Sequence, residues 1–402
     1  MKIDTQRIID RYIGTIICRF LSLWDRFFKK ESHTHGTKKI LIILLSEMGA
    51  LVLAYPMFQR LKEKYPAADL YVMLFEKNRE VVELLRTVPA GNLLTINDKS
   101  MPKFAGDVLR VLARMRKIKF DTVIDCELFS RVSSIFAFLS GAAVRVGFHP
   151  YTQEGLYRGN FINRPVLYNP YYHIARQFLT LVEAVDSPTH PKAKRQMAAG
   201  KLEIPSIELA QWEIENAQKS LLDIAPGVTG KKIVLIYPGG GLLPIRAWPL
   251  DRYCRLTEEL IQRGYAVCVI GLAEDKALAR AILSHVRNPV CVDLTGYTKT
   301  IRELILIFHF SSLLITNDGG PGHFAAMTPI PTIIFYGPET PALYSTLDEN
   351  AVHLYQGLSC SPCVTAYNHR NSPCDGDNVC LKTIRPDDVL AKALEILERQ
   401  IN

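Results

Sequence analysis

The sequence contains neither a long apolar run nor the cysteine pattern of a secreted protein. No apolar stretch approaches the roughly 20 residues that a membrane-spanning helix needs. Five of the nine cysteines are scattered along the 402 residues, and no cleavable signal segment is visible. We therefore expect a protein of the cytoplasm rather than an integral membrane protein or a secreted disulfide scaffold.

Most of the chain also lacks an excess of positive charge. The formal net charge is +8, but residues 1–39 hold nine Lys or Arg against four Asp or Glu, so the remainder is nearly neutral. A nucleic-acid-binding domain would show a basic stripe within its folded part, and no nucleic-acid partner is expected. The length predicts two domains or more.

The basic N-terminal segment has the pattern of an amphipathic helix. Apolar side chains recur every three or four residues over 4–28, with charged residues between them. The apolar members are Ile8, Ile9, Tyr12, Ile13, Ile16, Ile17, Phe20, Leu21, Trp24, Phe27 and Phe28. Such a helix suits an anionic bilayer interface, with Lys29 and Lys30 at its end. A helix docked on a neighbouring domain explains the pattern equally well.

From Lys38 onward, strand and helix patterns alternate in two consecutive blocks. This rhythm predicts two doubly wound, Rossmann-like α/β domains that face each other across a cleft. The expected parts are a helix and linker at 1–37, domains at 38–186 and 231–385, an interdomain region at 187–230 and a C-terminal helix at 386–402.

Two glycine turns at predicted strand ends are candidate phosphate sites. One is Gly239–Gly241, and the other lies within 313–326, which reads LLITNDGGPGHFAA. Glycines let a backbone approach a ligand closely, and the free amides of a following helix attract anions. Arg246 and His323 are expected to converge on one diphosphate. Neither turn has the GxGxxG or Walker pattern, which argues against an NAD-type dehydrogenase; a plain strand–turn–helix connection is the alternative.

A cluster of thiols lies near the C-terminus. Its members are Cys360, Cys363, Cys374 and Cys380. Four thiolates can bind a structural zinc tetrahedrally, but the second pair is spaced by five residues rather than two. We expect free or conditionally oxidised thiols and no metal, with a structural metal as the alternative.

The motifs TNDGGPGHFAA, PGGG…RAWP, GLAED, LTGYT and CSPC together resemble the family 9 glycosyltransferases, which include the heptosyltransferases of lipopolysaccharide core assembly. The resemblance extends from about Lys39 to Leu397. It implies a GT-B fold, a nucleotide-diphospho-sugar donor, for which ADP is favoured, transfer without a metal cofactor, and inversion at the anomeric carbon.

The resemblance also assigns roles to individual residues. The donor diphosphate and sugar nucleotide would be held by Gly239, Gly240, Arg246, Glu274, Asp318, Gly319, Gly320 and His323, with Glu274 at the ribose. Acceptor-side positions are Glu127, Arg131 and Arg145. An outward-facing helix would explain these last three equally well.

The segment SEMGALVLAYP departs from the family pattern at one position. In the family, an Asp follows the glycine of this loop and is thought to take the proton from the acceptor hydroxyl; here that position is Ala50. Glu47, three residues earlier on the same loop, is the predicted substitute base. Its alternative role is a cap or ion-pair partner for the following helix.

These inferences predict an inverting, metal-independent glycosyltransferase that moves a heptose or related sugar onto a lipopolysaccharide-core or other lipid-linked acceptor. The expected location is the cytoplasmic face of the inner membrane, where basic residues would bind the anionic surface. The alternative is a catalytically impaired nucleotide-sugar-binding or scaffold protein of envelope glycan assembly. The sequence does not determine the sugar, the nucleotide base, the acceptor or the oligomeric state.

Overall fold

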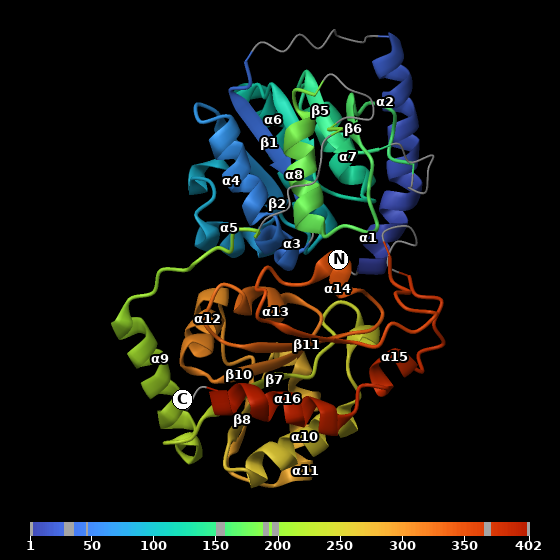
Figure 1. Ribbon diagram of the computed structural model, residues 1–402. Helices are drawn as coiled ribbons and strands as arrows, with labels where there is room; N and C mark the ends of the chain where they lie inside the picture. The colour runs from blue at the N-terminus through green and yellow to red at the C-terminus, as the bar shows by residue number, and fades with distance from the viewer. Residues whose placement is uncertain are drawn as a thin grey trace. The chain divides into compact units, whose positions relative to one another are not determined.

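The computed structural model describes residues 3–27, 36–45, 47–149, 157–187, 193–194, 201–365 and 371–399 (Figure 1). The chain divides into two compact units, residues 1–203 and 204–402. Lys29, Lys30 and most of the predicted linker lie outside the described residues. Among the described helices, none is long and apolar enough to cross a bilayer.

Unit 1 is built on a parallel sheet of six strands in the order β3-β2-β1-β4-β5-β6. The strands are β1 (Lys39–Ile43), β2 (Asp69–Phe75), β3 (Leu93–Ile96), β4 (Thr122–Asp125), β5 (Val144–Phe148) and β6 (Arg164–Val166). Every residue of β1 from Ile40 to Ile43 is buried. Such an uninterrupted apolar run is typical of a central parallel strand that is covered on both faces.

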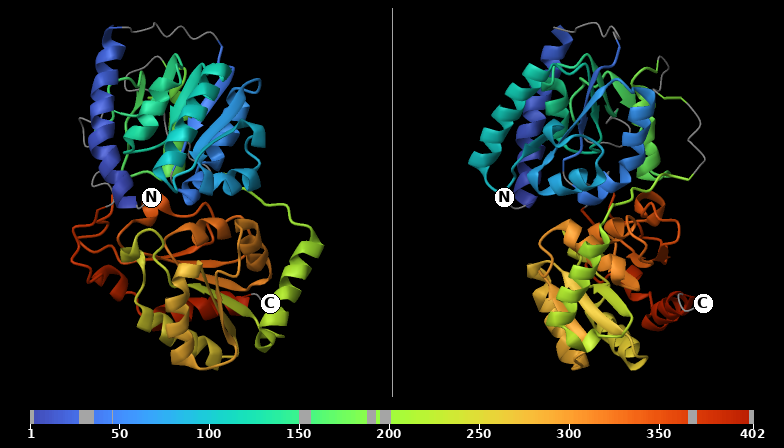
Figure 2. Two further views of the ribbon diagram at one scale, coloured as in Figure 1. Left: turned by 180° about the vertical axis from the view of Figure 1, so that it is seen from behind. Right: turned by 90° about the vertical axis from the view of Figure 1, so that its left-hand side faces the viewer.

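Helices cover both faces of this sheet (Figures 1 and 2). They are α3 (Met48–Leu53), α4 (Tyr55–Lys64), α5 (Arg79–Leu85), α6 (Met101–Ile118), α7 (Arg131–Leu139) and α8 (Ile174–Ala184). Side chains of α6 and α7 form one core with Leu41, Ile43 and Val123. On α4 and α8, Arg60 Nε donates to Glu183 at 2.8 Å.

The N-terminal segment is one long helix with a local irregularity. It consists of α1 (Ile3–Ile9), a π-helical turn η1 (Asp10–Gly14) and α2 (Thr15–Phe27). In Figure 2 it runs along the side of unit 1, and both η1 and α2 pack against α7. The predicted helix is therefore present, and it belongs to the body of unit 1.

Unit 2 repeats the same topology. Its sheet has the order β12-β11-β10-β7-β8-β9. The strands are β7 (Ile233–Tyr237), β8 (Ala266–Gly271), β9 (Cys291–Thr295), β10 (Leu313–Asn317), β11 (Thr332–Tyr336) and β12 (Val352–Tyr355). Read from the first strand of each unit, both sheets follow the order 3-2-1-4-5-6 of a Rossmann fold.

The helices of unit 2 are α9 (Gln211–Ile224), α10 (Leu250–Gln262), α11 (Lys276–Val286), α12 (Ile301–Phe310), α13 (Gly320–Ala325), α14 (Pro341–Tyr344), α15 (Val379–Lys382) and α16 (Pro386–Arg399). Helix α9, within the predicted interdomain region, is held to α12 by a 2.7 Å ion pair between Glu213 and Arg302. Trp248, Tyr253 and Phe335 form an aromatic group in the core.

The predicted pair of Rossmann-like domains is confirmed, and the missed strands share one property. No strand was predicted at β3, β6 or β12, and each of these strands lies at an edge of its sheet. Edge strands are short and partly solvated, so their periodic signal is weak; no residue of β12 is fully buried. After β1 the chain forms two helices in succession: α3 ends at Leu53, and α4 begins at Tyr55 with Pro56 in its first turn.

Candidate active site

Most of the predicted site residues follow the carboxyl ends of strands in the two sheets, whereas Arg145 lies within β5. In each sheet the strand order reverses between the first and fourth strands, β1 and β4 in unit 1, β7 and β10 in unit 2. Ligands of open α/β sheets bind at such switch points, because the adjoining loops leave in opposite directions. Glu47 and Glu127 follow β1 and β4, while Gly239 and Asp318 follow β7 and β10.

The turn after β7 requires glycine for steric reasons. A Cβ on Gly240 would lie 2.7 Å from the Cα of Pro244, and Gly241 has a φ of +58°. Both conditions exclude ordinary side chains. The tight turn leads into a short 3₁₀ turn, η5 (Pro244–Arg246), which brings Arg246 back toward the end of β10.

Asn317, the last residue of β10, ties the two glycine turns together. Its side chain donates to Gly239 O at 2.9 Å and accepts from Trp248 N at 2.9 Å and from the Tyr253 hydroxyl at 3.1 Å. The residue is fully buried. Asn317 was not among the predicted site residues; its hydrogen bonds set the spacing between the two turns.

Arg246 is buried between two carboxylates. Its Nη2 lies 2.5 Å from Glu339 Oε2, and its Nε lies 3.6 Å from Asp318 Oδ2. The exposed side-chain fractions are 12% for Arg246, 6% for Asp318 and 3% for Glu339. Glu339, which follows β11, was missed from the sequence. Its position at the end of the strand beside β10 was the available signal.

The electrostatics of this cluster favour one proton on the two carboxyls. Burial raises the pKa of Glu339 to about 8; Arg246 opposes the rise, and the neighbouring Asp318 carboxylate adds to it. Burial alone would lower the pKa of Arg246, but Asp318 and Glu339 outweigh that effect and raise it. Near neutral pH the Glu339 carboxyl therefore favours its neutral form beside the Arg246 guanidinium.

The other predicted donor residues lie at the same edge of this sheet. Gly319 has extended backbone, and Gly320 begins α13, in which His323 is buried. Glu274 lies in the 3₁₀ turn η6 (Ala273–Asp275) after β8 and is exposed. The ends of four neighbouring strands, β11, β10, β7 and β8, thus supply all the predicted donor positions and Glu339.

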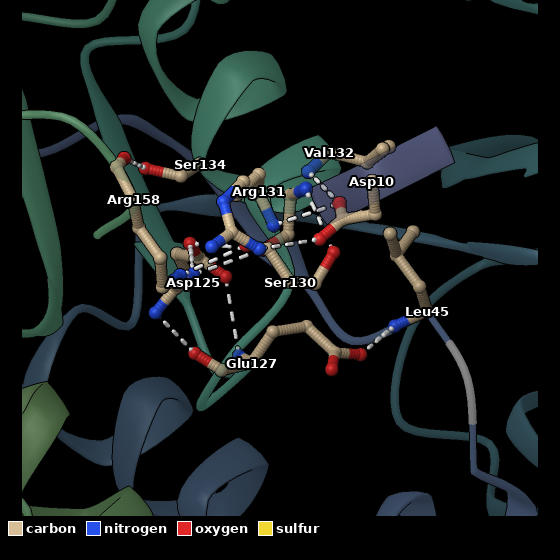
Figure 3. A network of polar contacts seen from close by, with 10 residues as sticks. Asp10, Leu45, Asp125, Glu127, Ser130, Arg131, Val132, Ser134 and Arg158 are labelled. Carbon is tan, nitrogen blue, oxygen red and sulfur yellow. Dashed lines mark hydrogen bonds and ion pairs between the residues drawn. The ribbon is translucent and has the colours of Figure 1, made fainter. Parts of the chain in front are cut away.

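In unit 1, Glu127 belongs to a buried polar network (Figure 3). Its Oε1 accepts a 2.7 Å hydrogen bond from Leu45 N, at the start of the loop that carries Glu47. Arg158 pairs with Asp125 and donates to the carbonyls of Glu127 and Ser130 at 2.6 and 2.8 Å. Desolvation raises the pKa of Asp125 despite this partner. Arg158 was not identified from the sequence.

Arg131 and Arg145, the predicted acceptor-side cations, both pair with the N-terminal helix. The distance from Arg131 Nη1 to Asp10 Oδ2 is 3.2 Å, and Arg145 Nη2 lies 3.0 Å from Asp25 Oδ1. Arg131 itself is 5% exposed. The structure thus gives both cations a role in holding the helix, and their contact with an acceptor stays a prediction.

Glu47 occupies the N-cap position of α3, and Ala50 lies in the first turn of the same helix. The Glu47 side chain is half-buried and makes no capping hydrogen bond to α3. The helix-cap alternative therefore does not describe this side chain. Its action as a base stays a prediction.

The four thiols do not form a metal site within the part of the chain that the structure describes, where no group of three or more His, Cys, Asp or Glu side chains is arranged to hold an ion. Ser372 Oγ donates to Cys363 Sγ at 3.0 Å, while Cys360 and Cys374 are exposed. Burial raises the pKa of Cys380.

Comparison with known proteins connects this geometry to one family. Residues 108–372 match the model described as glycosyltransferase family 9 (heptosyltransferase). Lipooligosaccharide heptosyltransferase 2 of Haemophilus ducreyi is 25% identical over 325 residues, covering 78% of this chain and 87% of that protein.

Solved structures show the same fold. ADP-heptose lipopolysaccharide heptosyltransferase II of Escherichia coli superposes with a TM-score of 0.70 at 20% identity, covering 90% of this chain and all of that one. The iron-containing dodecameric glycosyltransferase TibC of enterotoxigenic E. coli gives 0.53 at 13% identity, covering 91% and 78%. These matches confirm the predicted GT-B fold class.

Replacing Asn317 by alanine should destabilise unit 2. The change leaves the buried Trp248 amide and Tyr253 hydroxyl without this acceptor, which we expect to cost about 2–5 kcal/mol. Urea unfolding of N317A measures the loss. N350A removes an exposed amide and should change the free energy of unfolding by less than about 0.5 kcal/mol. Equal stability of the two variants would contradict the bridging role of Asn317.

The Glu339→Gln variant should remove one component of the pH dependence of stability. The ordinary pKa of 4.5 rises to about 8 in the folded state, so the native protein binds this proton more tightly than the unfolded chain. That contribution to stability falls as pH rises from about 4.5 to about 8 and then levels off. In urea unfolding across this range, the free energy of unfolding of E339Q should increase relative to that of the wild type as pH rises. E398Q, at an exposed position of α16, should show the same pH dependence of the free energy of unfolding as the wild type. The same pH dependence in E339Q would contradict the raised pKa of Glu339.

Proposed function

This chain belongs to glycosyltransferase family 9, and we propose that it transfers a heptose or related sugar from an ADP-linked donor to a lipopolysaccharide-core or other lipid-linked acceptor. One relative of known structure is the ADP-heptose lipopolysaccharide heptosyltransferase II of E. coli. A lipid-linked acceptor places the reaction at a membrane surface, which we propose is the cytoplasmic face of the cytoplasmic membrane.

The single observation that supports the donor site is the position of Arg246. It lies between two glycine turns at the switch point of unit 2, with Asp318 and Glu339 as its partners. Breaking the bond between the anomeric carbon and the diphosphate builds negative charge on the leaving oxygen. A guanidinium and backbone amides can stabilise that charge without a metal.

The proton on Glu339 makes the cluster suitable for an anion. Two ionised carboxylates around Arg246 would leave an excess negative charge and repel a diphosphate. With Glu339 neutral, Arg246 is balanced by Asp318 alone, and the incoming phosphates add the next negative charges. Glu274, exposed at the end of β8, is the proposed partner of the ribose hydroxyls.

For the chemical step we propose a single displacement with inversion. The acceptor hydroxyl attacks the anomeric carbon on the side opposite the nucleoside diphosphate, whose C–O bond breaks as the new C–O bond forms. Glu47 takes the proton of the attacking hydroxyl. The half-buried position of this side chain, at the start of α3 on the loop that follows β1, supports the role.

A second candidate function follows from Ala50. The usual proton-accepting position of the family carries a methyl group, whereas the donor cluster of unit 2 is complete. A nucleotide-sugar-binding protein without transfer activity would have this combination. Turnover separates the two functions, because both bind the donor.

Glu47→Gln should lower kcat by about 10²–10⁴-fold, because amide nitrogen and oxygen cannot take up the proton. The Kd for the donor should stay unchanged, since Glu47 and the donor cluster belong to different units. Single-turnover transfer and calorimetric donor binding measure the two effects. E63Q, on the exposed face of α4 with a 60% exposed side chain, should keep full activity.

Full activity of E47Q would remove Glu47 as the base. A wild-type protein that binds donor but neither transfers nor hydrolyses it, with every core acceptor tried, would support the second candidate function.

Donor identity can be tested by thermal shift with ADP-, UDP- and GDP-linked sugars. A ligand that binds only the native state raises the melting temperature by mass action. At a concentration 100-fold above its Kd it adds about 2.7 kcal/mol to the free energy of unfolding. ADP-heptose should give the largest shift. A larger shift with a UDP- or GDP-sugar would reject the ADP-linked donor while leaving the transferase proposal intact.

A further inference from the structure

The N-terminal helix contacts unit 1 through a narrow polar face. Asp10 Oδ1 accepts hydrogen bonds from the backbone amides of Arg131 and Val132, each at 2.9 Å (Figure 3). These amides belong to the first turn of α7, so Asp10 caps that helix together with Ser130. Fifteen positions along the chain, Asp25 pairs with Arg145 at 3.0 Å. Two buried or half-buried ion pairs thus fix both parts of the helix.

Small and buried residues fill the space between these ion pairs. A Cβ on Gly14 would lie 2.9 Å from the Cβ of Arg131, so the two helices approach closely there. Cys18 and Leu21 pack against Phe161. The inward face is therefore defined by positions 10, 14, 18, 21 and 25, which recur at helical spacing.

The rest of the helix exposes an unusually large apolar surface. Nine large hydrophobic side chains have exposed fractions between 38% and 72%. They are Ile8, Tyr12, Ile13, Ile16, Ile17, Phe20, Leu23, Trp24 and Phe27. A continuous apolar patch of this kind on a folded protein marks an interaction surface. Rotating the helix so that this patch faced unit 1 would break both ion pairs.

The charges beside this patch identify its partner. Arg11, Arg19 and Arg26 are exposed, whereas Asp10 and Asp25, the acidic residues among the described side chains of the helix, are engaged by unit 1. Among the described side chains, the outward face of the helix therefore offers cations and apolar groups, while both described carboxylates are directed into unit 1. Anionic lipid headgroups supply both the negative charge and the apolar layer beneath it.

We infer that the outward face of this helix lies in the interface of an anionic bilayer, and that the Asp10–Arg131 and Asp25–Arg145 pairs hold unit 1 in a fixed orientation on it. This deepens the proposed function, whose acceptor is lipid-linked. Trp24 and Tyr12, with apolar rings and polar edges, lie at the depth of the headgroups. The helix is thus a rigid part of the acceptor-side unit rather than a flexible tether.

The test is co-sedimentation of the full-length protein with vesicles that contain no glycan acceptor. Wild type should bind phosphatidylglycerol–phosphatidylethanolamine vesicles. I16E and F20E should each reduce partitioning by about tenfold or more, since each removes an exposed apolar side chain that the bilayer would bury. L109E, at a 70% exposed position on α6, is the matched control and should bind like wild type. R19Q/R26Q should lose affinity for anionic vesicles and keep its weaker affinity for phosphatidylcholine vesicles.

Tryptophan fluorescence provides an independent readout. Of the three tryptophans, Trp248 is buried, while Trp24 and Trp212 are 50% and 65% exposed. In a W212F background, vesicles should shift the Trp24 emission to shorter wavelength, and brominated lipids should quench it. I16E should abolish the shift while keeping the melting temperature of wild type, because position 16 faces away from unit 1.

Two results would overturn the inference. One is equal vesicle binding by wild type, I16E and F20E. The other is a wild-type dimer that binds no vesicles and becomes monomeric in I16E, which would assign the apolar face to a second copy of this chain. Because the vesicles contain no acceptor or donor, neither result depends on whether the protein transfers a sugar.

Discussion

Each unit depends on a buried arginine neutralised at the carboxyl edge of its sheet. Arg158 pairs with Asp125, and Arg246 pairs with Asp318 and Glu339. Removing one partner of a buried pair leaves an uncompensated charge and typically costs about 3–5 kcal/mol. These pairs therefore hold the loops at the two switch points in one arrangement.

The two arginines differ in what remains available to a ligand. Arg158 donates to a carboxylate, a hydroxyl and two backbone carbonyls, so its hydrogen-bonding capacity is directed into the protein. The Arg246 guanidinium contacts only the Asp318 and Glu339 carboxyl groups among its described side-chain partners. The Glu339 carboxyl favours its neutral form. The same device is thus structural in unit 1 and suited to anion binding in unit 2.

Local pattern predicted the strands and helices that surround these sites. Both predicted α/β blocks are present as six-stranded parallel sheets with their helices, because buried parallel strands are continuous apolar runs and the helices between them are strongly periodic. The glycine turns, Arg246 and Asp318 could be placed because they adjoin such strands.

Partners distant in sequence could not be predicted in this way. Arg131 and Arg145 are 121 and 120 residues from the aspartates that engage them, and no local spacing indicates such a pairing. Arg158 lies in an irregular segment without periodicity. The same limit applies to the N-terminal helix. Its amphipathic pattern was visible in the sequence, but the pattern did not indicate that Asp10 and Asp25 lie on the face that docks on unit 1.

The proposed exchange of a catalytic Asp at position 50 for Glu47 keeps a carboxyl group at the same end of one helix. Glu47 is the N-cap of α3, and Ala50 is three residues later, within the first turn. Both positions adjoin the free amides at the start of that helix, which favour a negatively charged side chain. The longer Glu side chain offsets part of the displacement along the loop, so the proposed exchange would move the carboxyl group along the chain without taking it away from the start of this helix.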